Sequence, residues 1–131
     1  TDLMIENNNK IQSFKQLRAW QEAHRLTLLV YTCTKQFPKE EIFGLTSQIR
    51  RSASSIGANI AEGFCRFSLK DKVHFYTIAA GSISETENHI ELAGDLGYIN
   101  AESYSMLQEQ LLSVYKLSNA LIKSIKVSPN Y

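Results

Sequence analysis

Apolar residues recur three or four positions apart through four long stretches of this chain, and short breaks separate the stretches. This spacing places apolar side chains on one face of an α-helix. The breaks contain helix-ending residues such as Pro38, Gly44 and Gly97. The sequence has neither a useful length of apolar/polar alternation nor an Asn-Gly or Asp-Gly hairpin turn, so nothing in it indicates a strand. The sequence therefore predicts an all-α, antiparallel, up-down-up-down four-helix bundle, because short connections make consecutive helices antiparallel neighbours.

Each predicted helix carries its own apolar stripe. The first helix, about residues 13–36, has Phe14, Leu17, Trp20, His24, Leu28 and Tyr31. The second, about 46–66, has Leu45, Ile49, Ala53, Ile56 and Ile60. The third, ending near 96, has Tyr76, Ala79, Ile83, Thr86, Ile90 and Ala93, and the fourth has Leu107, Leu111, Val114, Leu121 and Ile125. The bundle is expected to span residues 13–127, between a disordered lead-in at 1–12 and a tail at 128–131.

Local signals refine these boundaries. Ser68, three residues before Asp71, resembles a capping box and predicts the start of the third helix. Gly97 predicts a left-handed end for that helix. Asn100 is a good N-cap for the fourth helix. Small residues four apart, Ala53, Gly57 and Ala61, predict a close approach by a neighbouring helix.

The charge is nearly balanced but unevenly placed. The 131 residues carry a formal net charge of +1, which is not typical of a stand-alone nucleic-acid binder. Five basic residues and one acid lie between Lys10 and Lys35, whereas four acids and no Lys or Arg lie between Glu85 and Asp95. Such faces are either solvated or complementary across a subunit interface. No apolar run reaches the ~20 residues of a membrane helix, and we expect a cytoplasmic protein with no membrane partner.

The sequence predicts no enzyme, metal, cofactor or small-molecule substrate. A di-iron bundle needs Glu-x-x-His on two helices, and no Glu here has a His three residues later. Glu85 and His89, four apart, are read as an ion pair in preference to half of a metal site. No glycine-rich phosphate loop or nucleophile triad is present. The competing hypothesis is a helical ribonuclease that uses Arg18 and His24, although His24 falls on the predicted apolar stripe.

A polar stripe follows the second helix: Arg51, Ser55, Asn59, Glu62 and Arg66. Asn and Ser are poor choices for an exposed helix interior. We therefore predict a structural polar network in which Arg51, Asn59 and Glu62 meet Ser82 and Glu85 of the third helix. The alternative is an ordinary solvated face.

Two segments carry a family resemblance. FPKEEIFGLTSQIRRSASSIGANIAEGF and HFYTIAAGSISETENHIELAGDLGYI closely resemble the four-helix-bundle family encoded in intervening sequences of bacterial 23S ribosomal RNA, often labelled ribosomal-protein-like. The resemblance covers residues 14–125 and is weakest in the last helix. It implies a homo-oligomer, a pentameric ring, and a link to ribosomal RNA. The positions matching the family motif are Arg50, Arg51, Asn59, Glu62, Gly63, Ser82 and Glu85, and no catalytic residue is implied.

Oligomerisation and RNA binding are the resulting functional hypotheses. The large aromatics do not all fit one seam, so some are expected at an interface: Trp20, Tyr31, Phe64, Phe67, Phe75, Tyr98 and Tyr104. The expected nucleic-acid-binding residues are Lys15, Arg18, Arg25, Arg50 and Arg51. The sequence leaves open a protein-binding scaffold that binds no nucleic acid.

Overall fold

The computed structural model describes residues 11–131, so the predicted lead-in at 1–12 lies almost wholly outside the described residues. Within this range there are four α-helices and two short 3-10 turns, and no strand. The elements are η1 (Phe14–Gln16), α2 (Arg18–Thr34), η2 (Lys39–Glu41), α3 (Leu45–Phe64), α4 (Leu69–Asp95) and α5 (Ala101–Lys126). The predicted all-α class is confirmed. No helix among the described residues is long and apolar enough to cross a membrane.

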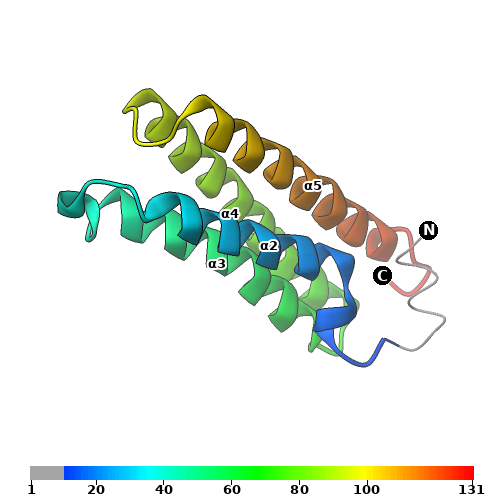
Figure 1. Ribbon diagram of the computed structural model, residues 1–131. Coiled ribbons are helices and arrows are strands. Elements are labelled where there is room, and N and C mark those ends of the chain that lie inside the picture. Colours follow the sequence, from blue (N-terminus) through cyan, green and yellow to red (C-terminus); the bar gives the residue numbers. More distant parts are fainter. Residues whose placement is uncertain (1–10) are drawn as a thin grey trace.

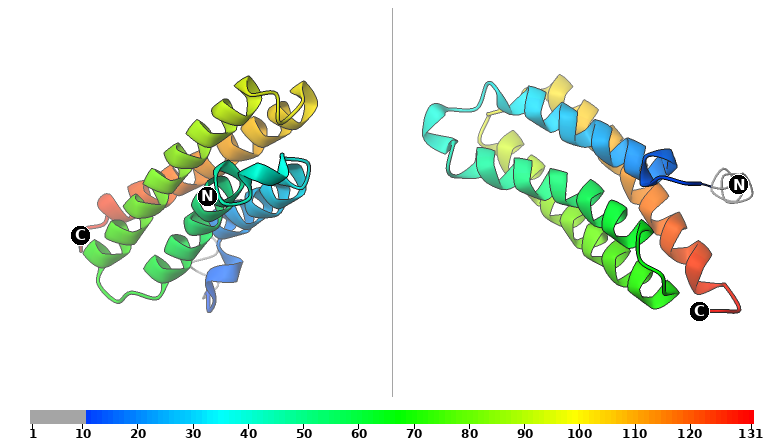
Figure 2. Two further views of the ribbon diagram at one scale, coloured as in Figure 1. Left: turned by 90° about the vertical axis from the view of Figure 1, so that its left-hand side faces the viewer. Right: turned by 90° about the horizontal axis from the view of Figure 1, so that it is seen from below.

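The four helices pack around a shared core (Figure 1). Helix α3 packs between α2 and α4, and α5 closes the arrangement by packing on both α4 and α2. The α2–α3 and α4–α5 connections lie at one end, and the α3–α4 connection lies at the other (Figure 2). Each helix therefore presents one face to the core, two edges to its neighbours and one face outward.

The helix ends follow the predicted local signals. The Ser68 hydroxyl accepts a hydrogen bond from the backbone N–H of Asp71 at 3.1 Å, and α4 begins at Leu69, directly after Ser68. The Asn100 side chain accepts from the N–H of Ser103 at 2.8 Å and caps α5. Gly97 has φ +76°, the left-handed conformation that ends a helix at low cost for glycine alone.

The predicted stripes of α3 and α4 are buried throughout. On α5, Leu107, Leu111, Val114 and Leu121 are buried, and Ile125 packs against the core while partly exposed. Ser52 and Thr86 are also fully enclosed, and their hydroxyl oxygens lie 2.9 Å apart across the α3–α4 contact. These three helices therefore bury the faces that the apolar spacing predicts.

The predicted stripe of the first helix is wrong for most of its residues, although Leu17 is buried in the core. The buried residues of α2 are Ala19, Ala23, Leu26, Val30 and Thr34. Leu28 is 56% exposed, Tyr31 is 43% exposed and His24 is exposed. The helix also starts later than predicted, because Leu17 is extended and separates α2 from η1.

Small side chains explain the different face of α2. Ala19 and Ala23 are completely buried, so the first part of α2 meets the core through short side chains, and Leu26 and Val30 enter the core further along. At Gly57 of α3, an added Cβ would lie 3.4 Å from Trp20 Nε1 and 4.0 Å from Ala23 Cβ. Trp20 thus covers the edge of the α2–α3 contact instead of filling the core. The close approach predicted from Ala53 and Gly57 is therefore made by α2.

Candidate interaction surfaces

The predicted nucleic-acid-binding residues do not form one patch. Lys15, Arg18, Arg25 and Arg51 are exposed and Arg50 is half-buried. Arg25 pairs with Glu22 at 3.3 Å, and Arg51 pairs with Glu85 of α4 at 2.6 Å. Arg50 instead faces α2, where its guanidinium carbon lies 4.6 Å from the centre of the Tyr31 ring. Adjacent positions on α3 therefore send Arg50 and Arg51 toward different helices.

The outward face of α2 is a line of exposed residues spaced three or four apart. It consists of Arg18, Gln21, Arg25, Leu28 and Thr32. Two arginines and an exposed leucine make this face basic and partly apolar, although the Glu22 carboxylate beside Arg25 reduces its charge. We call it the α2 outer face.

The predicted polar network is divided into separate clusters. Arg51 reaches Glu85, whose carboxylate also lies 3.3 Å from His89 Nε2. Asn59 donates to the backbone oxygen and hydroxyl of Ser55, and the Ser82 hydroxyl donates to that same hydroxyl at 3.0 Å. Asn59 therefore meets Ser82 only through Ser55.

Glu62 lies outside these two clusters, because it pairs with Arg66 one turn along α3 at 2.7 Å. The Arg51 and Glu85 side chains are 60% and 37% exposed, which makes that ion pair worth at most about 1 kcal/mol. No group of three His, Cys, Asp or Glu side chains within the described range could hold a metal ion.

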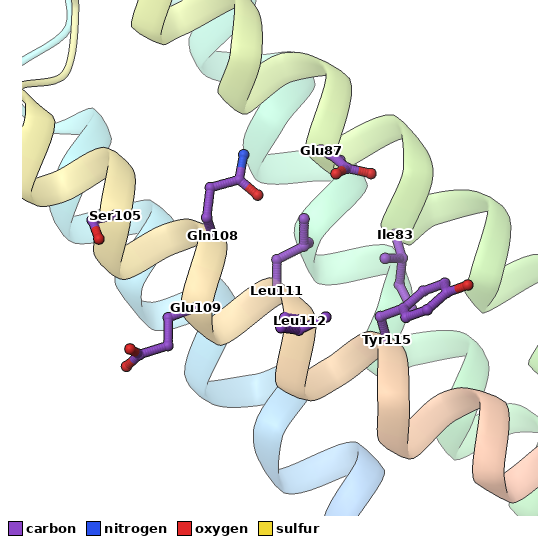
Figure 3. Close-up of a pocket in the computed structure, with 8 residues that line it drawn as sticks. All are labelled: Ile83, Glu87, Ser105, Gln108, Glu109, Leu111, Leu112 and Tyr115. Carbon is purple, nitrogen blue, oxygen red and sulfur yellow. The ribbon is translucent and has the colours of Figure 1, made fainter.

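A groove of about 660 Å³ runs between the outward sides of α4 and α5. Its lining includes Ile83 of α4 and Leu111, Leu112 and Tyr115 of α5, with Glu87 and Glu109 among its polar residues. In Figure 3 the Tyr115 side chain extends toward Ile83, and the Glu109 carboxylate points away from α4. The groove thus combines apolar surface with two acidic side chains and no Lys or Arg.

The acidic end of α4 continues beyond this groove. Gln108 of the groove donates to Glu91 at 2.6 Å, and the Tyr104 hydroxyl donates to the same carboxylate. This hydrogen bond to a carboxylate raises the pKa of Tyr104 above its usual value. The second half of α4 is therefore acidic, as the charge distribution of the sequence predicts.

A second hollow, of about 350 Å³, lies where α2 ends and α3 begins. Three of its lining residues are cationic: Lys35, Lys39 and Arg50. The remaining lining residues are Thr34, Phe37, Pro38, Ile42 and Thr46. We call it the cationic hollow. The sequence analysis missed it, because its three charges come from separate segments that the chain reversal after α2 brings together.

His24 does not occupy the core position that the sequence predicts. Its ring is exposed and stacks on Trp20, with 4.7 Å between ring centres and 13° between planes. The Phe14 ring packs edge-on against the Trp20 ring, with 5.3 Å between ring centres. Stacking on an indole gives His24 a packing role at the edge of α2.

None of the seven aromatic residues that the sequence analysis expects at an interface is fully buried. Tyr31 is exposed and so is Phe67, while Trp20, Phe64, Phe75, Tyr98 and Tyr104 are half-buried. The aromatic side chains that do enter the core are Tyr76 and Phe37. Burial raises the pKa of Tyr76 to about 12.

Comparison with known proteins shows which family has this sequence and this arrangement of helices. Residues 15–120 match the family model described as 23S rRNA-intervening sequence protein. A crystal structure of a protein of unknown function from the S23 ribosomal protein family of Bacteroides thetaiotaomicron superposes with a TM-score of 0.73. The two chains are 28% identical, and the match covers 80% of this chain and 98% of that one. No curated protein matches. The family match covers most of the chain, which therefore belongs to the 23S rRNA-intervening sequence protein family.

Proposed function

We propose that this chain is the subunit of a non-enzymatic homo-oligomer, a pentameric ring of up-down-up-down bundles, that acts in the cytoplasm as an RNA-associated adaptor. The observation that carries the proposal is family membership, since the family takes its description from 23S ribosomal RNA. The related crystal structure belongs to a family named for a ribosomal protein. Both names point to the same class of partner.

Two complementary surfaces support assembly from identical copies. The α2 outer face carries Arg18, Arg25 and the exposed Leu28. The α4–α5 groove offers apolar side chains together with Glu87 and Glu109. Opposite charges and matching apolar surface on different sides of one subunit favour a head-to-tail contact, which closes into a ring when the rotation permits. We therefore assign the α2 outer face first to subunit contact.

The non-enzymatic part of the proposal has support at His24. The ribonuclease hypothesis needs this imidazole as an acid or base, whereas its ring stacks on Trp20 in a packing arrangement. Incubation of purified protein with structured RNA tests this directly. Intact RNA supports the adaptor, and cleavage that disappears in His24→Ala would establish the ribonuclease instead.

Light scattering at micromolar concentration tests the assembly. We expect a mass of about five times that of the 14.8 kDa chain. Leu28→Glu places a charge in the proposed contact and should release monomers, because a buried unpaired carboxylate is costly. Ile78→Glu is the matched control, since Ile78 is also exposed but lies outside the groove. A wild-type monomer, or dissociation by Ile78→Glu alone, would contradict this interface.

Filter binding to structured RNA at about 50 mM salt tests the partner. We expect retention that does not depend on sequence and weakens steeply as salt rises, because phosphate contacts release counterions. A ring repeats each weak site around one axis, so monomeric Leu28→Glu should bind more weakly than wild type. If the intact oligomer retains no RNA, the alternative function is a protein-binding scaffold, which the apolar lining of the α4–α5 groove favours.

A further inference from the structure

The cationic hollow has a composition unlike the rest of the charged surface. Its cations are Lys35 at the end of α2, Lys39 in η2 and Arg50 on α3, and no carboxylate lines it. Glu40 follows Lys39 in the chain without lining the hollow. Glu41 is engaged elsewhere, because its two oxygens accept from the Leu45 N–H at 3.0 Å and the Tyr98 hydroxyl at 2.8 Å. The lining of the hollow is therefore cationic, and the nearby carboxylates of Glu40 and Glu41 lie outside it.

Ion pairing separates these cations from three arginines elsewhere on the surface. Arg25, Arg51 and Arg66 each pair with a glutamate, at 3.3, 2.6 and 2.7 Å. Within residues 11–131, Lys35, Lys39 and Arg50 form no ion pair with an acid. Three cations that form no such ion pair line one concave surface, which favours an anion there.

Arg50 is held in position before any ligand arrives. Its Nε donates to the Thr34 hydroxyl oxygen at 2.8 Å, and Thr34 is itself buried and donates to the Val30 carbonyl oxygen. Its guanidinium group lies over the Tyr31 ring. The two terminal amino groups of Arg50 bond to no acceptor among the described residues, so they remain available to a phosphate. A fixed guanidinium loses little entropy when it binds one.

Aromatic and apolar side chains surround the charges. Phe37, Pro38 and Ile42 form part of the lining, and Tyr31 is exposed beside Arg50. Phe43, the next residue after Ile42, is 93% exposed. Exposed aromatic rings beside a basic site are typical of proteins that bind single strands, since unpaired bases stack on such rings. A duplex keeps its bases stacked inside and gains nothing from these rings.

We propose that the cationic hollow binds a nucleotide of single-stranded RNA: Lys35, Lys39 and Arg50 hold its phosphate, and Phe43 with Tyr31 stacks on neighbouring bases. The identity of the ligand as RNA rests on the proposed function. The hollow lies at one end of the bundle, away from the α4–α5 groove, so each subunit of a ring carries its own copy. RNA binding is thereby assigned to the end of the bundle and not to the α2 outer face.

Fluorescence anisotropy with a labelled twelve-residue oligouridylate tests the site on the full chain. Lys35→Gln with Lys39→Gln should weaken binding at least about tenfold at about 50 mM salt. The slope of log affinity against log salt should become shallower by about 1.4, since each single-strand phosphate contact contributes about 0.7. Phe43→Ala should weaken binding about fivefold or more through lost stacking. A duplex of the same length should bind more weakly than the single strand.

The matched control is Lys116→Gln with Lys123→Gln, two exposed lysines of α5 whose loss changes net charge equally. It should alter affinity less than twofold. Equal weakening by both double variants would overturn the hollow as a site while leaving RNA association intact.

Titration of the protein with uridine monophosphate and with inorganic phosphate distinguishes the two proposals further. The NMR resonances of the Tyr31 and Phe43 rings are followed in each titration. We expect shifts with the nucleotide that Lys35→Gln with Lys39→Gln removes. Shifts with both small ligands but no binding of oligouridylate would overturn RNA as the ligand and the proposed function with it. Absence of any shift together with RNA binding would overturn only the hollow.

Discussion

Thr86 shows how the bundle satisfies a polar side chain in its core. Its hydroxyl oxygen lies 2.9 Å from that of Ser52 and 2.8 Å from the Ser82 backbone oxygen, and the residue is completely buried. The single hydroxyl hydrogen of Thr86 can be donated to either of these two oxygens. Ser52 in turn donates to the Ile49 carbonyl oxygen at 3.2 Å. This chain of hydrogen bonds fixes the register of α3 against α4, because a shift along either helix breaks it.

Thr86→Val should reduce the free energy of unfolding by about 1 kcal/mol, the net value of one buried hydrogen bond. The cost stays near this value because valine preserves the shape and the Ser52 hydroxyl still has the Ile49 oxygen as an acceptor. Urea denaturation measures the difference. Thr77→Val on the exposed side of α4 is the control and should change stability by less than about 0.5 kcal/mol. Equal effects of both substitutions would show that the buried hydrogen bond is not the cause.

At the scale of the helices, α3 and α4 pack closely where α3 ends. A Cβ added to Gly63 would lie 2.6 Å from Cε1 and 2.9 Å from Cδ1 of the buried Tyr76 ring, and 3.1 Å from Phe75 Cβ. Lys72 of α4 reaches back and donates to the Phe64 carbonyl oxygen at 2.7 Å, satisfying the end of α3. Burial lowers the pKa of this ammonium group. Helix α4 thus packs against the last turn of α3 and also caps it.

Gly63→Ala should therefore destabilise the protein by about 1–3 kcal/mol, the usual cost of overpacking a core. Gly81→Ala gives the opposite sign, because nothing lies within 4 Å of the added Cβ and alanine favours the helix by up to about 1 kcal/mol. Melting temperatures of the two variants should move in opposite directions. A neutral Gly63→Ala would mean that the Tyr76 ring moves aside without cost.

The sequence predicts the faces of α3, α4 and α5 because the large apolar residues that recur at helical spacing on each of them are the ones that are buried. It fails for α2, where Ala19 and Ala23 are buried and the larger Leu28 and Tyr31 are not. A prediction from periodicity gives most weight to large apolar residues, whereas a close contact between helices favours small side chains. The cationic hollow is beyond such a reading for a different reason: Lys35, Lys39 and Arg50 share no helical spacing and meet only after the chain reverses.

For the whole molecule, one hydrogen bond ties together two connections that are far apart in the sequence. Tyr98, in the α4–α5 connection, donates to Glu41 of η2 at 2.8 Å, and its ring lies 5.3 Å from that of Phe37. The backbone hydrogen bond from Leu45 and then the Tyr98 hydroxyl hold the pKa of Glu41 below its ordinary value of 4.5. The same hydrogen bond raises the pKa of Tyr98.

Tyr98→Phe should lower the melting temperature at pH 7, and the difference from wild type should shrink in acid. Because folding lowers the pKa of Glu41, its contribution is complete above pH 4.5 and is lost as the pH falls through the folded-state value. Melting curves from pH 7 to pH 3 measure the trend. Tyr131→Phe, an exposed tyrosine without this partner, should show no such dependence. A difference that is constant with pH would exclude the ionised carboxylate as the cause.

The placement of Trp20 has a spectroscopic consequence. It is the single tryptophan of the chain, it lies half-buried at the edge of the α2–α3 contact, and it stacks on His24. Intrinsic fluorescence excited at the indole therefore senses the local separation of these two helices, whereas circular dichroism averages over all four. Coincident transitions by both probes would indicate that α2 leaves only when the whole bundle unfolds. An earlier fluorescence change would show that α2 detaches as a unit of its own.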